Sequence, residues 1–385
     1  MLLLCFVVRE SKTMRIAFIS TVHGHSWPGS EYLWAATAEL LLAKGHQVYA
    51  QCSAGFSSSK PLKDLISKGL FYDPIKPRKS RIQRLIGRCF DSFTRLKKWN
   101  PDLVVVSAGS AFDISYQTAL VKFLLELPVP FIPICHFNAE TFWVEETNRA
   151  TMRRVYEKAA QSVFVCADNH RITERQLALK IEKFHVIRPP FPLVLDKPLP
   201  WPEENDDCWN FACVARLESR WKGQDILLEV LARPEWRERR WKLNLYGEGA
   251  EEVYLKALAC HYGIERKVIF QGFVNDRLEI WRNNHIQIFP TRGEGGPMVL
   301  TEGMMAGRCA VISDCGNARE YVQDGVDGFI SDFPTGSGFA KTLENAWTRR
   351  TDWRKMGEMA YASIKTLMPN SSAPEELLEI LNYES

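Results

Sequence analysis

Apolar residues in this chain form short unbroken runs, separated by longer stretches in which they recur every three or four residues. Unbroken apolar runs are typical of strands whose sheet is covered by helices on both faces. The longer stretches have the period of helices with one buried face. In the first half, this alternation predicts a helix over 31–44 and strands at 14–20, 46–52, 102–108, 130–135 and 162–167.

A proline-rich segment interrupts the alternation near the middle of the chain. Six prolines between Val186 and Asp207 remove backbone donors and disfavour helical angles. The pattern then resumes, with a helix predicted over 225–231 and strands predicted at 210–216, 241–247, 267–272, 285–290 and 309–313. The second half therefore repeats the doubly wound α/β architecture of the first.

The predicted organisation has two domains, in keeping with a length of 385 residues and a usual domain size of about 100–200 residues. Carboxyl ends of the two sheets would face each other across a cleft, where open α/β sheets bind ligands. A final helix over 374–382 is expected to pack back on the first domain. The expected segments are an unstructured leader (1–13), a Rossmann-like domain (14–190), a linker (191–208), a second Rossmann-like domain (209–366) and the C-terminal helix region (367–385).

The composition is that of an ordinary globular protein and excludes several specialised classes. Hydrophobic residues make up 46% of the chain and charged residues 25%, and the formal charge of +3 does not indicate nucleic-acid binding. The ten cysteines include no Cys-x-x-Cys pair, so neither a zinc knuckle nor a redox motif is indicated. We expect a reducing compartment, because the scattered cysteines do not indicate a disulfide framework. We expect a cytoplasmic location, and the apolar run at the start is far shorter than the roughly 20 residues of a membrane span.

The segment 291–303, TRGEGGPMVLTEG, contains a turn that can present a helix start to a ligand. Pro297 fits the first position of a helix, where its missing N–H has no consequence. Free N–H groups at Met298 and Val299 would then favour phosphate or sugar oxygens. Gly295 and Gly296 would allow a ligand to approach the backbone closely.

Glu294 and Glu302 flank this turn and are expected to reach opposite ends of one ligand. Ionised carboxylates accept strong hydrogen bonds from hydroxyl groups, which sugars supply in pairs. The alternative is that Glu294 is a solvated loop residue and Glu302 a charge on a helix surface.

Arg216 and Lys222 are predicted at the same cleft edge, because both follow the strand 210–216. Two fixed cations there could hold a pyrophosphate and neutralise its charge as it leaves. No Asp-x-Asp occurs in the chain, so the carboxylate clamp of a metal-bound nucleotide sugar is missing and cations would have to replace it. The alternative for each residue is an ordinary surface charge.

In the first half, Pro28, Gly29 and Ser30 form a tight turn whose amides would point into the cleft. His136 follows the strand 130–135 and could bond a substrate hydroxyl, or could be a structural histidine. His23 and His25 are weaker candidates, because both lie in a loop that could be exposed.

In combination these segments resemble the retaining glycosyltransferases of family 4, which have two Rossmann-like domains in the GT-B arrangement. The resemblance covers most of the chain. Its segments, in the family's order, are WPGSEYLWAATAELLLAKGHQV, ARLESRWKGQDILL, YGEGAEEVYLKALACHYGI, VIFQGFV, the pair of glutamates spaced as in 294–302, and GNAREYVQDGVDGFI.

The resemblance implies roles for these residues. Glu294 would contact the donor sugar, Glu302 the nucleotide ribose, Arg216 and Lys222 the diphosphate, and His136 the acceptor side. The donor site would further include Gly29, Ser30, Gly247, Gly272, Phe273, Val274, Gly295, Gly296, Pro297, Met298 and Val299. Three positions depart from the family pattern, namely Gly303, Asn317 and Ser30, and the first two bear on the preference for the donor sugar.

The reaction implied is transfer of a sugar from a nucleoside diphosphate of the UDP or GDP type, with retention of anomeric configuration and without a metal. The acceptor would be a glycan or a lipid-linked hydroxyl of cell-envelope or polysaccharide biosynthesis. No cofactor is expected, and the leaving phosphate can take the proton of the acceptor.

Residues 76–98 carry nine basic side chains and one acidic one, interleaved with apolar residues at helical spacing. This pattern predicts an amphipathic helix whose apolar face packs on its own domain. Its charge raises the hypothesis of peripheral contact with an anionic membrane surface.

Three other classes of protein remain open at this stage. A sugar-nucleotide epimerase would use the same cleft with acid–base residues of its own. A nicotinamide oxidoreductase is disfavoured, because the Gly247-Glu248-Gly249 segment lacks the third glycine of the dinucleotide fingerprint. A non-catalytic carbohydrate-binding protein would tolerate the loss of Arg216 and Lys222.

Overall fold

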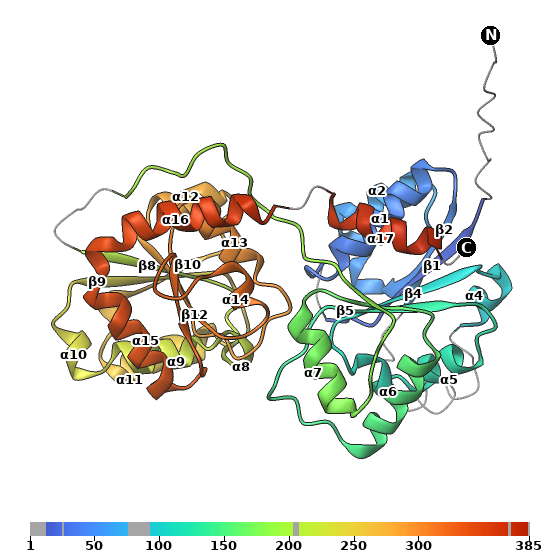
Figure 1. The fold of residues 1–385 in the computed structure, drawn as a ribbon, viewed down its shortest axis with the longest axis horizontal. Helices are drawn as coiled ribbons and strands as arrows, with labels where there is room; N and C mark the ends of the chain where they lie inside the picture. The colour runs from blue at the N-terminus through green and yellow to red at the C-terminus, as the bar shows by residue number, and fades with distance from the viewer. Residues whose placement is uncertain (1–12, 25–26, 76–92, 203–207, 369–370, 384–385) are drawn as a thin grey trace, which may run out of the picture.

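The computed structural model describes residues 13–24, 27–75, 93–202, 208–368 and 371–383. They form two α/β domains that lie side by side, each built on one parallel sheet (Figure 1). The expected leader, His25 and residues 76–92 of the basic segment lie outside or almost wholly outside these described residues.

The first sheet has seven strands in the order β3-β2-β1-β4-β5-β6-β7, so the strand order reverses between β1 and β4. Its strands are β1 (Arg15–Ser20), β2 (Gln47–Ser53), β3 (Phe71–Ile75), β4 (Leu103–Ala108), β5 (Phe131–Cys135), β6 (Ser162–Phe164) and β7 (Phe184–Val186). The helices are α1 (Glu31–Ala43), α2 (Lys60–Ser67), α4 (Thr94–Trp99), α5 (Thr118–Glu126), α6 (Glu146–Lys158) and α7 (Ala167–Leu177), with 3-10 turns at Ala54–Ser58 and Asp113–Tyr116.

Both faces of this sheet are buried, which explains the unbroken apolar runs. In β1, Ile16 and Phe18 pack with α1 and α2 on one face. Ala17 and Ile19 point to the other face and pack with α4, α5 and α6. Alternate side chains of the strand thus pack into two different cores, so no position in the middle of the strand is free for a polar residue.

The second sheet has six strands in the order β10-β9-β8-β11-β12-β13, the order of a Rossmann fold. Its strands are β8 (Trp209–Val214), β9 (Trp241–Tyr246), β10 (Val268–Gly272), β11 (Ile286–Phe289), β12 (Ala310–Ser313) and β13 (Gly328–Ser331). The helices are α8 (Ser219–Lys222), α9 (Gln224–Leu231), α10 (Pro234–Arg237), α11 (Glu252–Tyr262), α12 (Arg277–Arg282), α13 (Met298–Met305), α14 (Ala318–Tyr321), α15 (Gly336–Thr348) and α16 (Trp353–Thr366), with 3-10 turns at Glu265–Lys267 and Arg350–Asp352.

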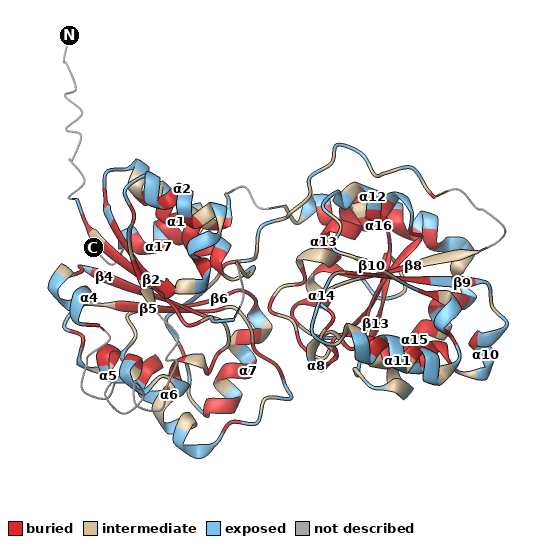
Figure 2. Ribbon diagram, turned by 180° about the vertical axis from the view of Figure 1, so that it is seen from behind, coloured by how far each residue is buried: buried red, intermediate tan, exposed pale blue. Residues whose placement is uncertain are grey.

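Helices cover both faces of this sheet too, and its strands are largely buried (Figure 2). Residues of α9, α10, α11 and α15 pack on one face. Those of α12, α13, α14 and α16 pack on the other. The α/β class and the two Rossmann-like domains predicted from the sequence are therefore confirmed.

Three strands were missed by the sequence pattern, and one was predicted three residues too long. β3 contains Pro74 and Asp73, β7 lies at a sheet edge, and β13 has only four residues, so none has a distinct apolar run. β6 ends at Phe164, although the apolar run continues to Ala167. Short or edge strands carry too few residues for a periodic signal.

The chain crosses between the domains twice (Figure 1). In the first crossing, the described residues between Val186 and Trp209 form no helix or strand, as their prolines predict. Arg308, which is 1% exposed, fastens this segment to the second domain. Its Nη2 atom donates to the carbonyl of Pro200 at 2.6 Å, while its Nε atom donates to that of Trp281 at 3.0 Å.

The second crossing carries the last helix, α17 (Ala373–Tyr383), back to the first domain. Leu377 and Leu381 are fully buried in the core that contains α1. Thr37 of α1 donates its hydroxyl to the carbonyl of Pro374 at 3.3 Å. The C-terminal segment is thus part of the first domain, where α17 covers α1.

Part of the basic segment can be placed. Phe93 and Leu96 are 5% and 0% exposed in the core of the first domain, so the prediction that the apolar face packs inward is confirmed for these two residues. In the described parts of the chain, no helix is long and apolar enough to cross a membrane.

The packing of α17 predicts that the first domain loses stability when its buried leucines are shortened. We expect Leu377→Ala to lower the free energy of unfolding by about 2–5 kcal/mol, because it removes buried apolar volume. Exposed Glu379, on the same helix, is the control, and Glu379→Ala should change it by less than about 0.5 kcal/mol. Urea unfolding followed by circular dichroism measures both, and equal stabilities for the two variants would contradict this packing.

Candidate active site

Lys222 and Glu294 form an ion pair at the carboxyl edge of the second sheet. Their Nζ and Oε1 atoms are 2.5 Å apart, and their side chains are 22% and 16% exposed. Lys222 ends α8, which follows β8, and Glu294 lies in the loop after β11. Since β8 and β11 are neighbours where the strand order reverses, the two residues meet at the ligand-binding edge of an open α/β sheet.

Two neighbouring loops are locked together to make this pair. Gly223 has a φ of +66°, and a Cβ there would lie 2.0 Å from the carbonyl oxygen of Pro290, so only glycine fits. The hydroxyl of Thr291 donates to the carbonyl of Trp221 at 2.7 Å, and the backbone N–H of Arg292 donates to the same carbonyl at 2.8 Å. The end of α8 is therefore fixed against the loop that carries Glu294.

Glu302 is buried on α13 and pairs with Arg277 at the start of α12. The residue is 5% exposed, and its Oε1 atom lies 2.6 Å from Nη1 of Arg277. Burial raises the pKa of Glu302 to about 7, and the positive charge of Arg277 opposes this rise. The alternative interpretation of Glu302 as a helix surface charge is thus wrong, and that of Glu294 as a solvated residue is wrong too.

The start of α13 differs in detail from the sequence prediction. The helix begins at Met298, and Pro297 precedes it as the N-cap with a φ of −75° and a ψ of 78°. The N–H of Met298 donates to the carbonyl of Gly296 at 2.8 Å. This bond closes an inverse γ-turn centred on Pro297, whose φ and ψ are close to the values of that turn. The prediction that this N–H is free to bind an anion is therefore wrong.

The glycine-rich loop of the second domain packs directly on the first domain. A Cβ at Gly295 would lie 1.8 Å from the carbonyl oxygen of His136. A Cβ at Gly296 would lie 2.6 Å from Cγ of Pro189. The predicted site residues of the two domains therefore meet, and the absence of side chains at 295–296 is what permits this approach.

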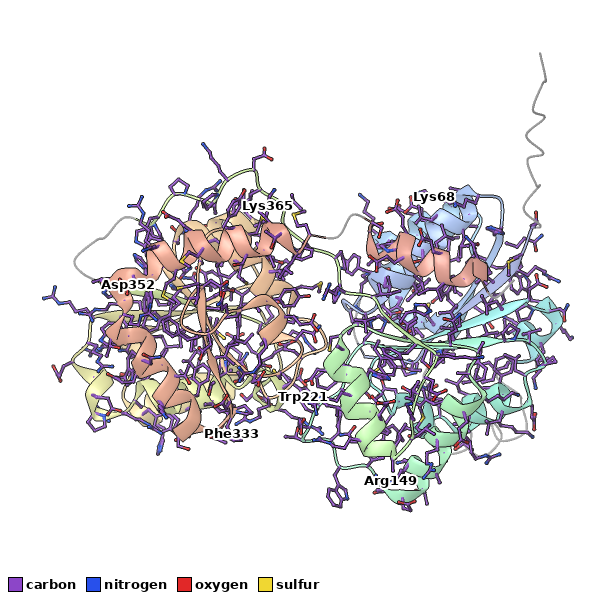
Figure 3. The ribbon with its side chains drawn as sticks, viewed as in Figure 1. Lys68, Arg149, Trp221, Phe333, Asp352 and Lys365 are labelled. Atoms are coloured by element: carbon purple, nitrogen blue, oxygen red, sulfur yellow. The ribbon has the colours of Figure 1, made fainter. Side chains whose placement is uncertain are left out.

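Trp221 forms a second contact between the domains and lies at their junction (Figure 3). Its ring packs edge to face against Phe137 and Phe142 of the first domain, with centroids 5.0 and 5.1 Å apart. Lys222 is the next residue along α8, so this aromatic contact also sets the position of the ion pair.

His136 is neutral in this environment. Its Nε2 atom lies 3.0 Å from the hydroxyl oxygen of Ser107, and burial lowers its pKa to about 4. A neutral imidazole can orient a hydroxyl group through a hydrogen bond but brings no positive charge to the cleft.

The turn at the start of α1 is held by Glu31, which the sequence analysis missed. Glu31 is fully buried and accepts hydrogen bonds from Nε1 of Trp34 at 2.8 Å and from the hydroxyls of Ser20 at 3.1 Å and Ser30 at 3.2 Å. Burial raises its pKa to about 7. Its position directly after the turn 28–30, within an otherwise apolar helix face, is the signal that could have identified it. Gly29 in this turn faces Cε of Met298, which a Cβ would approach to 3.3 Å.

Arg216 and the predicted residues around Gly247 follow β8 and β9 and lie at the same edge of the sheet. The side chain of Arg216 is 56% exposed and lies 3.2 Å from Glu218. The N–H of Gly247 donates to the carbonyl of Gly272 at 2.7 Å, which joins two predicted donor-binding segments. Phe273 beside them is exposed, and Val274 packs against the core. Arg277, which pairs with Glu302, follows this segment closely and was missed because a single arginine carries no motif.

The structure explains two of the three departures from the family pattern. A Cβ at Gly303 would lie 2.4 Å from the amide of buried Gln287, so alanine would displace that side chain. Asn317 has a φ of +70°, a left-handed conformation that asparagine tolerates in place of glycine. Both positions thus retain the local backbone geometry.

No group of three or more histidine, cysteine, aspartate or glutamate side chains in the described residues is arranged to hold a metal ion. The cationic side chains at this edge of the second sheet include those of Lys222, Arg216 and Arg277.

Comparison with known proteins identifies the fold of the chain and a family that its second domain matches. Residues 201–363 match the family described as glycosyl transferases group 1. The structure of the lipopolysaccharide outer core galactosyltransferase WaaB superposes with a TM-score of 0.69 at 17% identity, over 97% of this chain and 100% of that one. Anabaena Alr3699/HepE in complex with UDP and glucose superposes with a TM-score of 0.72 at 17% identity, over 96% and 100%. The chain has the GT-B fold.

Curated relatives of the GT-B chain are similar over shorter stretches. The putative glycosyltransferase EpsD of Bacillus subtilis is 30% identical over 137 residues, 36% of each chain. The lipopolysaccharide 1,6-galactosyltransferase of Salmonella typhimurium is 26% identical over 132 residues, 33% of this chain and 36% of that one. The chain thus spans about a third of the length of the curated relatives it matches.

The contact of Gly295 with His136 predicts that the closed arrangement of the domains depends on a missing side chain. We expect Gly295→Ala to increase the radius of gyration and to lower stability by about 1–3 kcal/mol, because the added methyl group overlaps a backbone carbonyl. Small-angle X-ray scattering and thermal melting measure the two effects. Gly29→Ala is the control, since its methyl would meet only the flexible end of Met298 at 3.3 Å. An unchanged radius of gyration for Gly295→Ala would contradict the packing.

Proposed function

We propose that this protein is a retaining glycosyltransferase, which moves a sugar from a nucleoside-diphosphate sugar to a hydroxyl group of a glycan or lipid-linked acceptor. The observation that carries the proposal is the Lys222–Glu294 pair, which a glycine loop holds against His136 of the opposite domain. A cation beside a carboxylate suits a sugar phosphate, because the phosphate group pairs with the cation and the sugar hydroxyls donate hydrogen bonds to the carboxylate.

In the proposed complex, the donor lies along the edge of the second sheet. Glu302 would accept hydrogen bonds from both hydroxyls of the ribose, and the charge of Arg277 would favour the ionised form of its carboxylate. Lys222 would bind the diphosphate, with Arg216 nearer to solvent. Glu294 would then exchange part of its contact with Lys222 for a hydroxyl of the donor sugar.

The proposed chemistry uses these charges when the bond between sugar and phosphate breaks. Negative charge develops on the leaving oxygen, and Lys222 and Arg216 stabilise it in the role that a metal has in other enzymes. The acceptor hydroxyl attacks from the face that the phosphate leaves, and the phosphate oxygen takes its proton. His136 orients that hydroxyl, and the closed contact between the domains excludes water.

Two comparisons support a sugar nucleotide as the donor and an envelope glycan as the acceptor. One relative is a lipopolysaccharide 1,6-galactosyltransferase, and one similar structure holds UDP and glucose. We therefore propose a UDP-type or GDP-type donor, without a metal requirement, in cell-envelope or polysaccharide biosynthesis.

A melting screen with UDP, GDP, ADP and their sugars tests the proposal. A ligand present at about 100 times its dissociation constant adds about 2.7 kcal/mol of stability, which raises the melting temperature by several degrees. Release of the nucleotide from a sugar donor, detected by chromatography, would support transfer. Conversion of the sugar nucleotide into an epimer, or binding without turnover at any acceptor concentration, would replace the proposal with an epimerase or a binding protein.

The two glutamates should affect different steps. We expect Glu302→Gln to weaken nucleotide binding by about tenfold or more, since a hydrogen bond to a charged group is lost. We expect Glu294→Gln to slow transfer by about 100-fold, with a smaller effect on nucleotide affinity. Glu358→Gln is the control, because Glu358 is an exposed partner of Arg354 on α16. Calorimetric titration and initial rates separate the steps, and negligible effects of both changes would contradict the assigned roles.

The raised pKa of Glu302 predicts pH-dependent donor binding. Ionised Glu302 would accept hydrogen bonds from two hydroxyls of the donor. Because its pKa is about 7, its ionised fraction rises as the pH increases from 6 to 8. We expect affinity for the sugar nucleotide with the largest melting shift to rise by up to about tenfold over this range. The diphosphate of such a donor is fully esterified and does not titrate there, so Glu302→Gln should abolish the dependence. If the pH dependence of donor binding persists in this variant, a group other than Glu302 causes it.

A further inference from the structure

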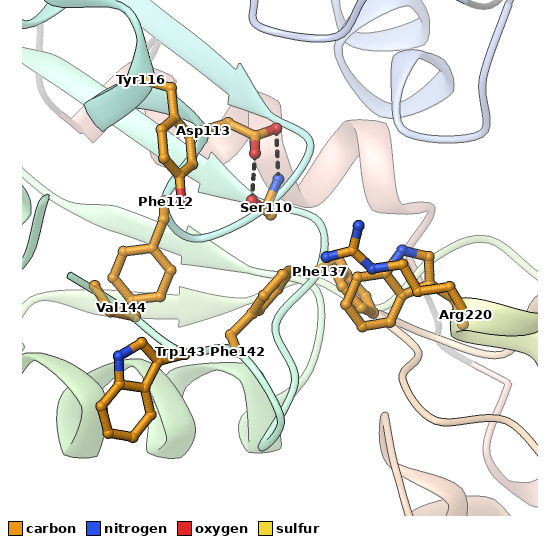
Figure 4. A pocket seen from close by; sticks show the side chains of 10 residues that line it. Ser110, Phe112, Asp113, Tyr116, Phe137, Phe142, Trp143, Val144 and Arg220 are labelled. Carbon is orange, nitrogen blue, oxygen red and sulfur yellow. Dashed lines mark hydrogen bonds between the residues drawn. The ribbon is translucent and has the colours of Figure 1, made fainter.

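A pocket lined by aromatic residues lies between the domains (Figure 4). Its volume of about 340 Å³ is at the lower end of the range for small-ligand sites. The first domain contributes Phe112, Tyr116, Phe137, Phe142 and Trp143, and the second contributes Arg220 and Trp221. None of these residues was predicted to bind a ligand.

The position of the pocket connects it with the transfer site. Arg220 and Trp221 directly precede Lys222 in α8. Phe137 follows His136, and a Cβ at Gly293 would lie 2.7 Å from its ring. A molecule in the pocket would therefore have one end next to the loop that carries Glu294.

Two of the aromatic side chains are far more exposed than their size favours. Trp143 is 90% exposed and Tyr116 is 67% exposed. Large aromatic surfaces in contact with water beside a cleft are typical of binding sites, because a ligand that covers them releases the water. Trp143 and Phe142 lie close to each other on one side of the pocket, and Tyr116 and Phe112 lie above them in the view of Figure 4.

The pocket also has a fixed hydrogen-bond acceptor. The Oδ2 atom of Asp113 accepts the backbone N–H of Ser110 at 3.0 Å and the hydroxyl of Thr21 at 3.4 Å. Its Oδ1 atom accepts the hydroxyl of Ser110. A carboxylate has about four acceptor positions, so these three bonds hold Asp113 rigid and leave capacity for a ligand hydroxyl.

We propose that this pocket binds a pyranose ring of the acceptor, so that the acceptor is a saccharide. This inference rests on the proposed glycosyltransferase function. The C–H groups on one face of a pyranose are weakly positive and apolar, and they pack well on the negative face of an aromatic ring. Its hydroxyls lie at the rim of the ring, where Asp113 accepts one and the guanidinium of Arg220 donates to another.

An isoprenoid chain fits the same surface less well. A lipid tail would cover the aromatic rings but would also remove water from Asp113 and Ser110 without giving them hydrogen bonds. A saccharide supplies both the apolar face and the hydroxyl groups. A sugar therefore accounts for the polar and the aromatic residues of the pocket together, whereas an isoprenoid chain accounts only for the aromatic ones.

Saturation-transfer NMR on the full chain with saturating UDP tests this proposal. The probes are the methyl glycosides of glucose, galactose, mannose and N-acetylglucosamine, and farnesyl phosphate as the lipid probe. We expect at least one glycoside to bind. We expect Trp143→Ala and Tyr116→Ala each to weaken that binding by about tenfold, or about 1.4 kcal/mol.

The matched control is Phe333→Ala, which removes an aromatic side chain that is 66% exposed on the second domain and does not line the pocket. It should leave glycoside binding unchanged. Glycoside affinities that are unaltered in both pocket variants, or displacement of the glycoside signal by farnesyl phosphate, would overturn the proposal. So would the absence of binding by all four glycosides.

The UDP-induced melting shift separates this inference from the function on which it rests. A chain that binds UDP but no glycoside contradicts the saccharide pocket and leaves the donor site intact. A chain whose melting temperature responds to no nucleotide contradicts the proposed function itself.

Discussion

The candidate site depends on the close approach of two loops that follow β8 and β11. Gly223 turns the chain with a left-handed backbone directly against the carbonyl of Pro290, and this contact brings Lys222 to Glu294. Any side chain at position 223 would separate the loops. The backbone turn therefore brings positions 222 and 294 together, and the ion pair forms between side chains that the turn has already placed close to each other.

The same loops hold the two domains in a closed arrangement. Trp221 packs against Phe137 and Phe142, and Gly295 lies against the carbonyl of His136. The return of the chain in α17 also ties the second domain to the first. These contacts give the cleft one wall from each domain, which the proposed transfer between two substrates needs.

Sequence patterns predicted the fold well and the site only in part. Strands such as β4 and β8 were recognisable because both of their faces are buried. Edge strands such as β3 and β7 were missed, since partial burial leaves no run of apolar residues. Lys222 and Glu294 were expected at one edge because parallel strands end together. Arg277, Glu31 and the aromatic pocket were missed, because no local motif marks them.

The sequence by itself determined the two Rossmann-like domains and the sheet edge at which the candidate site residues lie. These follow from local periodicity and from the rule that parallel strands place their carboxyl ends together. Only the tertiary structure decided that Glu302 is buried against Arg277 and that Trp221 contacts the opposite domain. The burial of a residue and its contacts with residues far away in the sequence depend on how whole elements pack, which a linear pattern does not encode.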